Sequence, residues 1–461
     1  MAAMHHTAKK RPVVSGFVLG IYSGLMRLAQ PLLRRKMARR ALQEPGYGEA
    51  VDERFGRYTQ NAETSSELVW IHAVSLGETR TAAILLTALR ARHPGLRLLL
   101  THGTATGRAE GKALLQPGDI QLWQPWDTQS VVEAFFEHFK PRLGLLIETE
   151  VWPCLVSGAK ARSMPLVLVN GRLSDKSLQQ ALCMSQLAYP AYAALTAVCA
   201  QTAADAKRYR QLGVDIDLGV AGVFGNLKFD ATPSPSQQAT GKAWRSALNQ
   251  SVVMFASSRE GEETLFLEEI KAVSEQIRLQ DAIGNMAFKA PLKWLPKYLI
   301  VPRHPQRFDE VAALVVRYGL RLSRRSSWLG SPFENDEAMA ADVWLGDTLG
   351  EMALYYALSD VALLGGSFEK LGGQNLIEAA GCGCPMVLGP HTFNFFEVAE
   401  LAESAGAAKR VADMAGAVSW AVHFANDREG QTRMSQAALA FASAHHGATR
   451  RTVQALRAFL T

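Results

Sequence analysis

The fold is decided at residues 365–378, Gly-Gly-Ser-Phe-Glu-Lys-Leu-Gly-Gly-Gln-Asn-Leu-Ile-Glu, which follow a strand-like run at 360–364 and join a glycine-rich turn to an apolar helix. The order strand, turn, helix is typical of parallel α/β sheets. Glycines let the backbone approach a ligand closely, and amides at a helix start attract phosphate. Asn375 and Glu378 are one turn apart, and a carboxylate there suits ribose hydroxyls. The stretch therefore predicts an α/β nucleotide site.

Short apolar runs alternate with helix-length amphipathic segments along the whole chain. The strand-like runs are 68–74, 96–101, 143–147, 166–170, 197–200, 217–220, 252–256, 298–301, 343–345, 361–364 and 386–388. Residues 231–241 have the composition of a linker. We therefore expect two doubly wound, Rossmann-like domains facing a cleft, at 41–230 and 242–461, with the last helices packing back on the first domain. The segments 279–294 and 323–339 fit no element of this pattern and are expected to be inserted loops.

The basic charge of the chain lies at its N-terminus. The formal net charge is +6, but the first 60 residues hold 11 Lys/Arg against 4 Asp/Glu, so the remainder is at −1. A neutral body excludes a broad nucleic-acid-binding surface.

A charge-free stretch at 12–26 lies between lysines and arginines on both sides. It is short for a membrane span, and adding residues 28–33 reaches a spanning length only if Arg27 snorkels. We expect residues 1–40 to form a membrane-anchoring helix that lies at the cytoplasmic face, with its cations on anionic headgroups. A true span, a secretory signal and a buried helix with solvated flanks are the alternatives.

The cysteines and histidines indicate neither a disulfide framework nor a metal site. There are five cysteines, none in a Cys-x-x-Cys pair, and the eleven histidines are scattered. An odd, unpaired set is typical of a reduced cytoplasmic protein. We expect no metal cofactor.

In the first half, charged residues follow strand-like runs, where α/β sheets bind ligands. Glu78 falls in the first turn of the helix after 68–74, where pairing with the helix dipole, about 0.3–1 kcal/mol, is the structural alternative. Glu148 ends the buried run 143–147, so it needs a cationic partner, and Lys228 is the candidate. One acid for base chemistry and one cation for a leaving anion form a coherent set.

In the second half, the same reasoning selects three segments. Arg303 follows Pro302 at a strand end, and a guanidinium there suits phosphate or carboxylate recognition. Residues 350–352 follow another strand and open a helix whose amides are placed to contact a base or phosphate. Residues 375–378 complete the nucleotide site predicted above.

Six motifs carry a resemblance to a known family. They are Leu-Gly-Glu at 76–78, Glu-Thr-Glu-x-Trp-Pro at 148–153, Asn-Gly-Arg-Leu-Ser at 170–174, Gly-Asn-Leu-Lys-Phe-Asp at 225–230, Pro-Arg-His-Pro at 302–305 and Gly-Gly-Gln-Asn-x-x-Glu-Ala at 372–379. In this order they resemble the 3-deoxy-D-manno-octulosonic acid (Kdo) transferases of lipopolysaccharide synthesis. The resemblance runs from 53–56 to about Glu397 and includes the N-terminal anchor.

The resemblance implies a two-domain glycosyltransferase of the GT-B type, with the acceptor bound by the N-terminal domain and the nucleotide sugar by the C-terminal one. Such an enzyme moves Kdo from CMP-Kdo to a lipid A precursor, lipid IVA, with inversion and without a metal, on the cytoplasmic side of the inner membrane. The alternatives are a related GT-B enzyme that uses a UDP-sugar on a membrane lipid acceptor, and a non-catalytic membrane-bound protein that binds a sugar nucleotide. The number of Kdo units added and the oligomeric state stay open.

Roles follow from the same resemblance. Glu78 would be the general base, and Glu148 and Lys228 would stabilise the transition state. The implied CMP-binding residues are Pro302, Arg303, Gly350, Glu351, Met352, Asn375, Leu376, Ile377 and Glu378.

Overall fold

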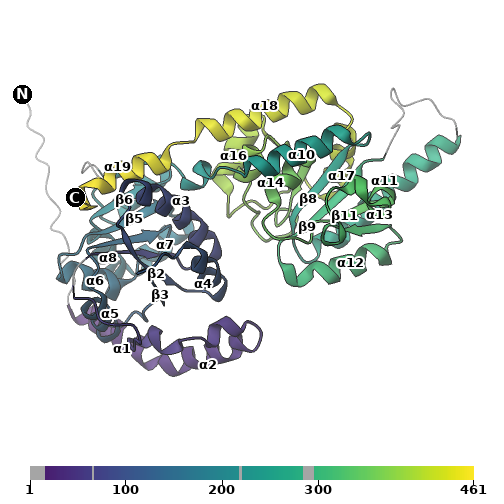
Figure 1. The fold of residues 1–461 in the computed structure, drawn as a ribbon. Helices are drawn as coiled ribbons and strands as arrows, with labels where there is room; N and C mark the ends of the chain where they lie inside the picture. Colours follow the sequence, from purple (N-terminus) through teal and green to yellow (C-terminus); the bar gives the residue numbers. More distant parts are fainter. Residues whose placement is uncertain (1–15, 65–66, 217–220, 284–294, 461) are drawn as a thin grey trace, which may run out of the picture. The chain divides into compact units, whose positions relative to one another are not determined.

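The computed structural model describes residues 16–64, 67–216, 221–283 and 295–460, which form two compact units (Figure 1). Unit 1 comprises Met1–Asp230 and His446–Thr461, and unit 2 comprises Ala231–His445. In the described part of the chain each unit contains one seven-stranded, all-parallel sheet. The prediction of two parallel-sheet α/β domains is confirmed.

The sheet of unit 1 has the order β3-β2-β1-β4-β5-β6-β7. Its strands are β1 Leu68–His72, β2 Arg97–His102, β3 Ile120–Trp123, β4 Leu143–Ile147, β5 Leu166–Gly171, β6 Ala197–Ala200 and β7 Gly222–Val223. The chain first builds outward from β1 through β2 to β3 and then restarts at β4, on the other side of β1. The carboxyl ends of β1 and β4 therefore flank the switch point, where α/β sheets bind ligands.

Helices cover both faces of this sheet, whose strands are mostly apolar and buried. They are α3 Leu76–Arg92, α4 Ala105–Gly111, α5 Gln129–Phe139, α6 Pro153–Ala161, α7 Asp175–Cys183, α8 Ser185–Ala193, α9 Ala203–Gln211 and α19 Ala448–Leu460, with 3-10 helices η1 Pro45–Gly48, η2 Val51–Phe55, η3 Lys112–Leu114 and η4 Leu227–Asp230. Trp70 of β1 packs on Phe135 and Phe136 of α5 on one face. Val69 and Ile71 pack on the other face, in the cluster that includes residues of α3 and α19.

Several helices begin directly after a strand because a hydroxyl caps them. Ser75, Thr104, Thr128 and Thr202 accept the backbone N–H three residues ahead and start α3, α4, α5 and α9. Such caps satisfy amides that a helix start leaves without a partner. The loops between strand and helix are thereby kept short.

The sheet of unit 2 has the order β10-β11-β9-β8-β12-β13-β14. Its strands are β8 Val252–Ser258, β9 Lys297–Pro302, β10 Leu322–Arg324, β11 Val343–Leu345, β12 Val361–Leu364, β13 Met386–Leu388 and β14 Ala408–Arg410. Its helices are α10 Pro235–Ala247, α11 Glu262–Ile283, α12 Phe308–Arg317, α13 Asp336–Ala340, α14 Met352–Leu358, α15 Ile377–Gly381, α16 Phe396–Ser404, α17 Met414–Phe424 and α18 Arg428–Ala444, with η5 Pro305–Arg307, η6 Arg325–Ser327 and η7 Pro332–Glu334.

Two helices precede the first sheet, α1 Gly16–Leu28 and α2 Gln30–Ala41. One face of α1 packs on unit 1, where Leu19 is buried and the Trp126 indole donates to the Met26 carbonyl at 2.8 Å. Among the described residues, no helix is both long and apolar enough to cross a membrane. Residues 1–15 of the predicted anchor lie outside the described residues.

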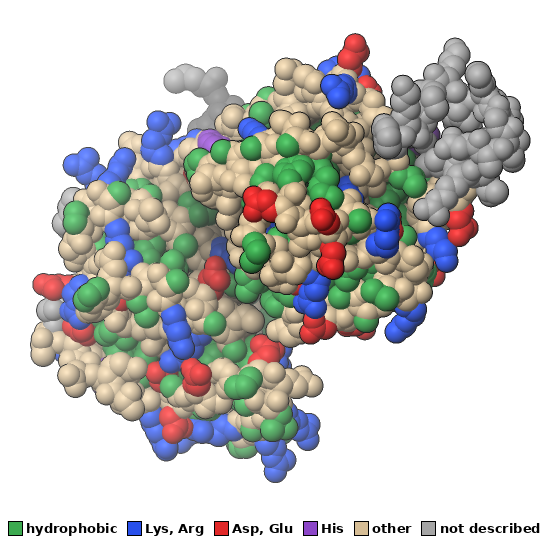
Figure 2. Space-filling model, turned by 45° about the vertical axis from the view of Figure 1, so that its right-hand side comes forward, with side chains coloured by type: hydrophobic (Ala, Val, Ile, Leu, Met, Phe, Trp, Pro, Cys, Tyr) green, Lys and Arg blue, Asp and Glu red, His purple; other side chains and the backbone are tan. Residues whose placement is uncertain are grey.

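The outer face of these two helices carries apolar and basic side chains together. Phe17, Ile21, Leu25, Leu28 and Leu32 are each at least half exposed. The first four lie on α1 at a spacing of three or four, which places them along one stripe of that helix, and Leu32 lies on α2. Figure 2 shows Lys and Arg side chains beside hydrophobic ones at the lower edge of the molecule, the height at which α2 lies in Figure 1.

The linker predicted at 231–241 is wrong from Pro235 onward, because α10 starts there. Ser234 caps the helix by accepting the Gln237 N–H at 3.4 Å, and Pro235 takes a first-turn position, where its missing N–H costs nothing. Gly241 lets α10 lie against α14, since a β-carbon there would clash with the Leu354 carbonyl oxygen. The serine and the proline therefore start helix α10, and the glycine lets it pack against α14.

Two other sequence expectations need correction or fall outside the description. The segment 323–339 is not a loop, because it contains η6, η7 and α13. The segment 279–294 is helical up to the end of α11 at Ile283, and its residues 284–294 lie outside the described residues, as does the strand-like run 217–220.

We predict that Gly241→Val destabilises unit 2 by about 1–3 kcal/mol, the usual range for overpacking. Its β-carbon would also approach the Ala357 β-carbon to 2.9 Å. Gly24→Ala on α1 is the control, since no atom lies within 4 Å of its β-carbon position. Urea denaturation measures both, and equal stability of the two variants would contradict the packing argument.

Candidate active site

The loops that follow β1, β4, β5 and β7 meet at the carboxyl edge of the unit 1 sheet. Glu78 lies just after β1, Glu148 just after β4, and Lys228 on η4 after β7. Since β1 and β4 are neighbours, the two carboxylates flank the switch point. The structure therefore brings together the three residues that the sequence analysis selected in the first half.

Glu78 is held by its own loop. Its carboxylate accepts the Val74 N–H at 2.7 Å and the Ser75 hydroxyl at 3.2 Å, while Ser75 caps α3. Burial, and then the negative charges of Glu150 and Glu148, raise the pKa of Glu78 to about 8 in spite of these hydrogen bonds. A carboxylate that binds a proton near neutral pH is well matched to general base chemistry.

Glu148 and Lys228 form an ion pair in which Nζ and Oε1 are 2.7 Å apart, with side-chain exposures of 13% and 21%. Lys228 is thus the cationic partner expected for this carboxylate. The Asn170 amide and the Thr81 hydroxyl lie 3.4 and 3.5 Å from the same oxygen. Glu148 has a φ of 64°, in the left-handed region that costs energy for a side chain with a β-carbon.

Two further residues lie beside this pair: Glu150, the second acid of the motif at 148–153, and His72, which the sequence analysis missed. Glu150 accepts the Trp152 indole N–H at 2.8 Å, and its Oε2 lies 3.9 Å from Nε2 of His72. Burial lowers the pKa of His72 to about 3, so the ring is neutral and the contact is not an ionic one. His72 gave no signal because it ends an apolar run. Glu150 was recognised within the motif at 148–153, but no role was assigned to it.

Asn170 connects the loops after β5, β6 and β7. Its Oδ1 accepts the Leu227 N–H at 2.9 Å, and its carbonyl accepts the Gln201 amide at 3.0 Å. Its φ of 56° is another left-handed value. These bonds fix the amide that faces Glu148.

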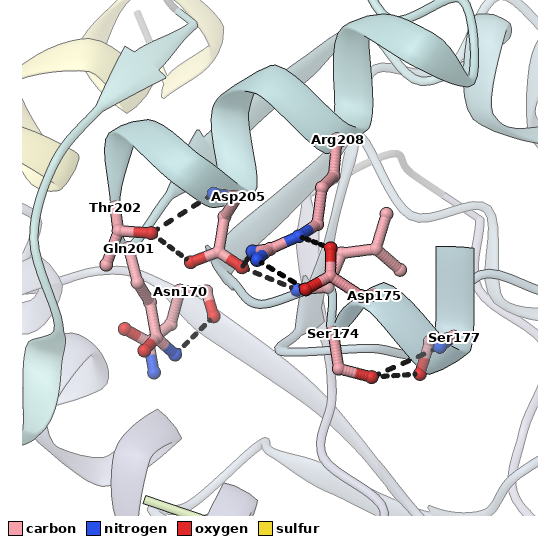
Figure 3. A network of polar contacts seen from close by, with 9 residues as sticks. Asn170, Ser174, Asp175, Ser177, Gln201, Thr202, Asp205 and Arg208 are labelled. Carbon is pink, nitrogen blue, oxygen red and sulfur yellow. Dashed lines mark hydrogen bonds and ion pairs between the residues drawn. The ribbon is translucent and has the colours of Figure 1, made fainter. Parts of the chain in front are cut away.

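A neighbouring polar network holds the loop that follows β5 (Figure 3). Asp205 accepts the Leu173 N–H at 2.8 Å and the Thr202 hydroxyl at 2.7 Å. Arg208 lies between Asp205 and Asp175, with Nε donating to Asp175 at 2.7 Å. These bonds therefore hold the backbone of the motif at 170–174 in place beside the candidate site.

In unit 2 the loops after β9, β8 and β12 share one edge, because these strands are neighbours. Pro302 ends β9, and the Arg303 N–H donates to the Ser258 carbonyl at 3.0 Å. Arg303 and Glu378 both act on the buried phenol of Tyr356, whose pKa burial and Glu378 raise and Arg303 lowers. The charges of two of the predicted nucleotide ligands therefore both act on one residue of α14.

Residues 350–352 form the turn that starts α14. Gly350 has a φ of 81°, and its carbonyl accepts the Gln237 amide at 2.8 Å. The Glu351 carboxylate accepts the Tyr355 hydroxyl at 3.1 Å and pairs with Arg325 at 2.8 Å. The side chain of Glu351 is thus bound within unit 2, and Met352 is the first residue of the helix.

The glycine-rich turn does not offer its first amides to a phosphate. The buried Glu262 carboxylate accepts the N–H groups of Gly366, Phe368 and Glu369 at 2.7, 3.0 and 3.3 Å. The prediction of phosphate binding at this part of the turn is wrong, because the carboxylate of Glu262, about a hundred residues earlier in the chain, already accepts the hydrogen bonds of these amides.

The helix after this turn is also shorter than predicted. α15 starts at Ile377 and has five residues, so Asn375 and Leu376 precede it. Asn375 Oδ1 accepts the Ile377 N–H at 3.1 Å, and Glu378 falls in the first turn. Asn375 and Glu378 are therefore not on one helical face, and the dipole of so short a helix is small.

No group of three or more His, Cys, Asp or Glu side chains could hold a metal ion within the ranges that the structure describes.

Comparison with known proteins places this geometry in a family. Residues 49–231 match the model described as 3-Deoxy-D-manno-octulosonic-acid transferase (kdotransferase). The chain is 44% identical to the 3-deoxy-D-manno-octulosonic acid transferase of Bordetella pertussis, over 96% of this chain and 99% of that protein. It is 28% identical to the protein of the same name from Haemophilus influenzae, over 95% and 98%.

Among solved structures, the UDP-GlcNAc 2-epimerase of Neisseria meningitidis covers 85% of this chain and 100% of its own, with a TM-score of 0.54 and 14% identity. At that identity the likeness concerns the fold alone. The fold is that of two parallel-sheet α/β domains, like the GT-B glycosyltransferases.

We predict that Glu78→Gln stabilises the protein at pH 8.5 by about 1–3 kcal/mol and has little effect near pH 5. With a folded pKa of about 8 against an ordinary value of 4.5, the protonated acid suits the fold, and stability is lost as pH rises through this window. Glutamine stays neutral and avoids that loss. Urea denaturation at the two pH values gives the difference.

Glu133→Gln on α5 is the matched control, because Glu133 is exposed. A stabilisation by Glu78→Gln that does not change with pH would contradict the raised pKa.

Proposed function

Because the chain belongs to the 3-deoxy-D-manno-octulosonic acid transferase family, and so is a glycosyltransferase that transfers Kdo in lipopolysaccharide synthesis, we propose that its donor is CMP-Kdo and its acceptor a lipid A precursor, lipid IVA. The observation that carries the proposal is the position of Glu78 beside the Glu148–Lys228 pair at the switch point. Glu78 has a raised pKa that the charge of Glu148 helps to raise, and Glu148 is paired with Lys228, so one edge of the sheet carries a candidate base and a cation.

The reaction we propose is a single displacement with inversion. Glu78 takes the proton from a sugar hydroxyl of the acceptor as that oxygen bonds to the anomeric carbon of Kdo. The bond from this carbon to the CMP phosphate oxygen breaks, and CMP leaves with the electron pair. Glu148 stabilises the positive charge that grows on the sugar, and Lys228 the negative charge that grows on the phosphate. No covalent intermediate is needed.

Unit 2 supplies the groups that suit CMP. The Arg303 guanidinium, which follows Pro302, is proposed to bind the phosphate, and the Glu378 carboxylate the ribose hydroxyls. The backbone at 350–352 and at 375–377 is proposed to contact the rest of the nucleotide. The shared electrostatic effect of Arg303 and Glu378 on Tyr356 supports this grouping.

We expect Glu78→Gln to lower transfer by about 100-fold or more, as loss of a general base does, and to leave CMP binding unchanged. The enzyme is incubated with CMP-Kdo and lipid IVA, and mass spectrometry of the lipid reports the transfer and the number of Kdo units. Thermal shift with CMP measures binding. Glu133→Gln is the control.

Full transfer by Glu78→Gln would refute the role of this carboxylate. A clear thermal preference for UDP over CMP would favour the UDP-sugar alternative.

We also propose that α1 and α2 lie on the cytoplasmic surface of the inner membrane. The exposed apolar stripe of α1 supports burial among acyl chains, since its other face is fixed to unit 1, where the Ser23 hydroxyl accepts the Gln129 N–H at 3.0 Å. Beside it a groove of about 410 Å³ is lined by Leu32, Arg35, Lys36, Arg39, Arg40 and Gln43. A basic, partly apolar groove suits a phosphorylated headgroup.

We expect the triple substitution Arg35→Glu, Lys36→Glu, Arg39→Glu to weaken binding to phosphatidylglycerol vesicles by about 100-fold, at roughly 1 kcal/mol for each cation. Vesicle cosedimentation measures it. A control with the same charge change uses Lys207→Glu, Arg433→Glu and Arg457→Glu, which are exposed elsewhere. Equal loss in both variants would refute a site on α2.

A further inference from the structure

Asp230 ties together the two places where the chain passes between the units. It is the last residue of unit 1 before unit 2, and its carboxylate binds the chain where unit 1 resumes at His446. Oδ1 accepts the Gly447 N–H at 2.5 Å, and Oδ2 accepts the Thr449 N–H. Both amides belong to the start of α19, where a negative charge is favoured by the free N–H groups and the helix dipole.

The same turn carries Lys228. The helix η4 runs from Leu227 to Asp230, so the lysine and the capping aspartate are two residues apart. A 3-10 turn of this length has few hydrogen bonds of its own, here Phe229 N–H to the Asn226 carbonyl at 3.1 Å. Its position therefore depends on the bonds that its two ends make with other elements.

A second bond fixes the chain just before η4. The Arg451 guanidinium of α19 donates to the Phe224 carbonyl through Nε at 2.9 Å and through a second nitrogen at 2.7 Å. Gly225 makes room for it, since a β-carbon there would lie 3.0 Å from that guanidinium and its φ is 87°. The segment before η4 is thus held along α19.

The other end of η4 is bound to the active site. Asn170 Oδ1 accepts the Leu227 N–H at 2.9 Å, and the same side chain faces Glu148 at 3.4 Å. Lys228 completes the connection with its 2.7 Å ion pair to Glu148. The lysine therefore stands on a turn that Asn170 fixes at the start and Asp230 at the end.

We propose that Asp230 is a positioning residue for the transfer reaction: by binding the start of α19 it holds η4 so that Lys228 stays paired with Glu148. The inference rests on the role proposed above for Lys228. Asp230 contacts neither donor nor acceptor in this scheme. Its effect passes through the lysine, and a displacement of about 1 Å at such a group can lower a rate 100-fold.

Asp230→Asn tests the proposal, because it keeps the size of the side chain and removes its charge and one of its two acceptors. We expect kcat to fall about 10-fold or more, while KM for CMP-Kdo changes less than about 2-fold, as for a group that acts in the transition state. Asp413→Asn is the matched control. Asp413 caps α17 through the Gly416 N–H at 2.8 Å, within unit 2, so it should lower the melting temperature and leave kcat unchanged.

A double-mutant cycle with Lys228→Ala separates positioning from general destabilisation. If Asp230 acts through Lys228, Asp230→Asn should have no further effect on kcat in the Lys228→Ala enzyme, measured by mass spectrometry after long incubation. An equal loss in both backgrounds would overturn the inference. So would an unchanged kcat in Asp230→Asn when Lys228→Ala is impaired. Full activity of Lys228→Ala would instead refute the proposed role of the lysine.

Arg451→Met gives a second route if Asp230→Asn does not accumulate as folded protein. Arg451 is exposed and holds the same segment through Phe224. We expect it to lower kcat in the same direction, with no effect in the Lys228→Ala enzyme. An unchanged kcat in Arg451→Met would then overturn the inference.

Discussion

The ion pair between Glu148 and Lys228 is the interaction on which the rest of the unit 1 site depends. A parallel sheet buried on both faces leaves its carboxyl edge as the place for polar side chains, and an unpaired carboxylate there is costly. The lysine removes that cost at 2.7 Å. The backbone is unusual here too, since Glu148 and Asn170 both take left-handed φ values, and their side chains meet at 3.4 Å.

The strands could be predicted because their physics is local. A strand of a covered parallel sheet reads as a short apolar run, and most such runs in the sequence are strands in the structure. The errors came where a local pattern has two physical meanings. Ser234, Pro235 and Gly241 have the composition of a linker. In the structure Ser234 caps α10, Pro235 is its first residue, and Gly241 allows the close approach of α10 to α14.

Candidate site residues could be predicted where a charged side chain follows directly after an apolar strand-like run. Glu78, Glu148 and Lys228 were found in this way. His72 was not, because a histidine at the end of an apolar run does not differ in pattern from a buried structural one. The glycine turn misled for a related reason: Glu262, far away in sequence, fills the amides that seemed open to a phosphate. Local sequence indicates which backbone amides can bind an anion. It does not indicate whether a carboxylate from a distant part of the chain already accepts their hydrogen bonds.

The C-terminal helix gives unit 1 a dependence on the whole chain. α19 packs on α3, which carries Glu78. The start of α19 is capped by Asp230 of η4, the turn that also carries Lys228. The partners of Asp230 lie 217 and 219 residues further along the chain, with all of unit 2 between them. Contacts so distant in sequence require the closure of a long loop, which costs entropy and is associated with slow folding. The last helix therefore supports the edge that carries Glu78 and Lys228, and a chain that ends within unit 2 would lack the bonds that Asp230 and Arg451 make beside η4.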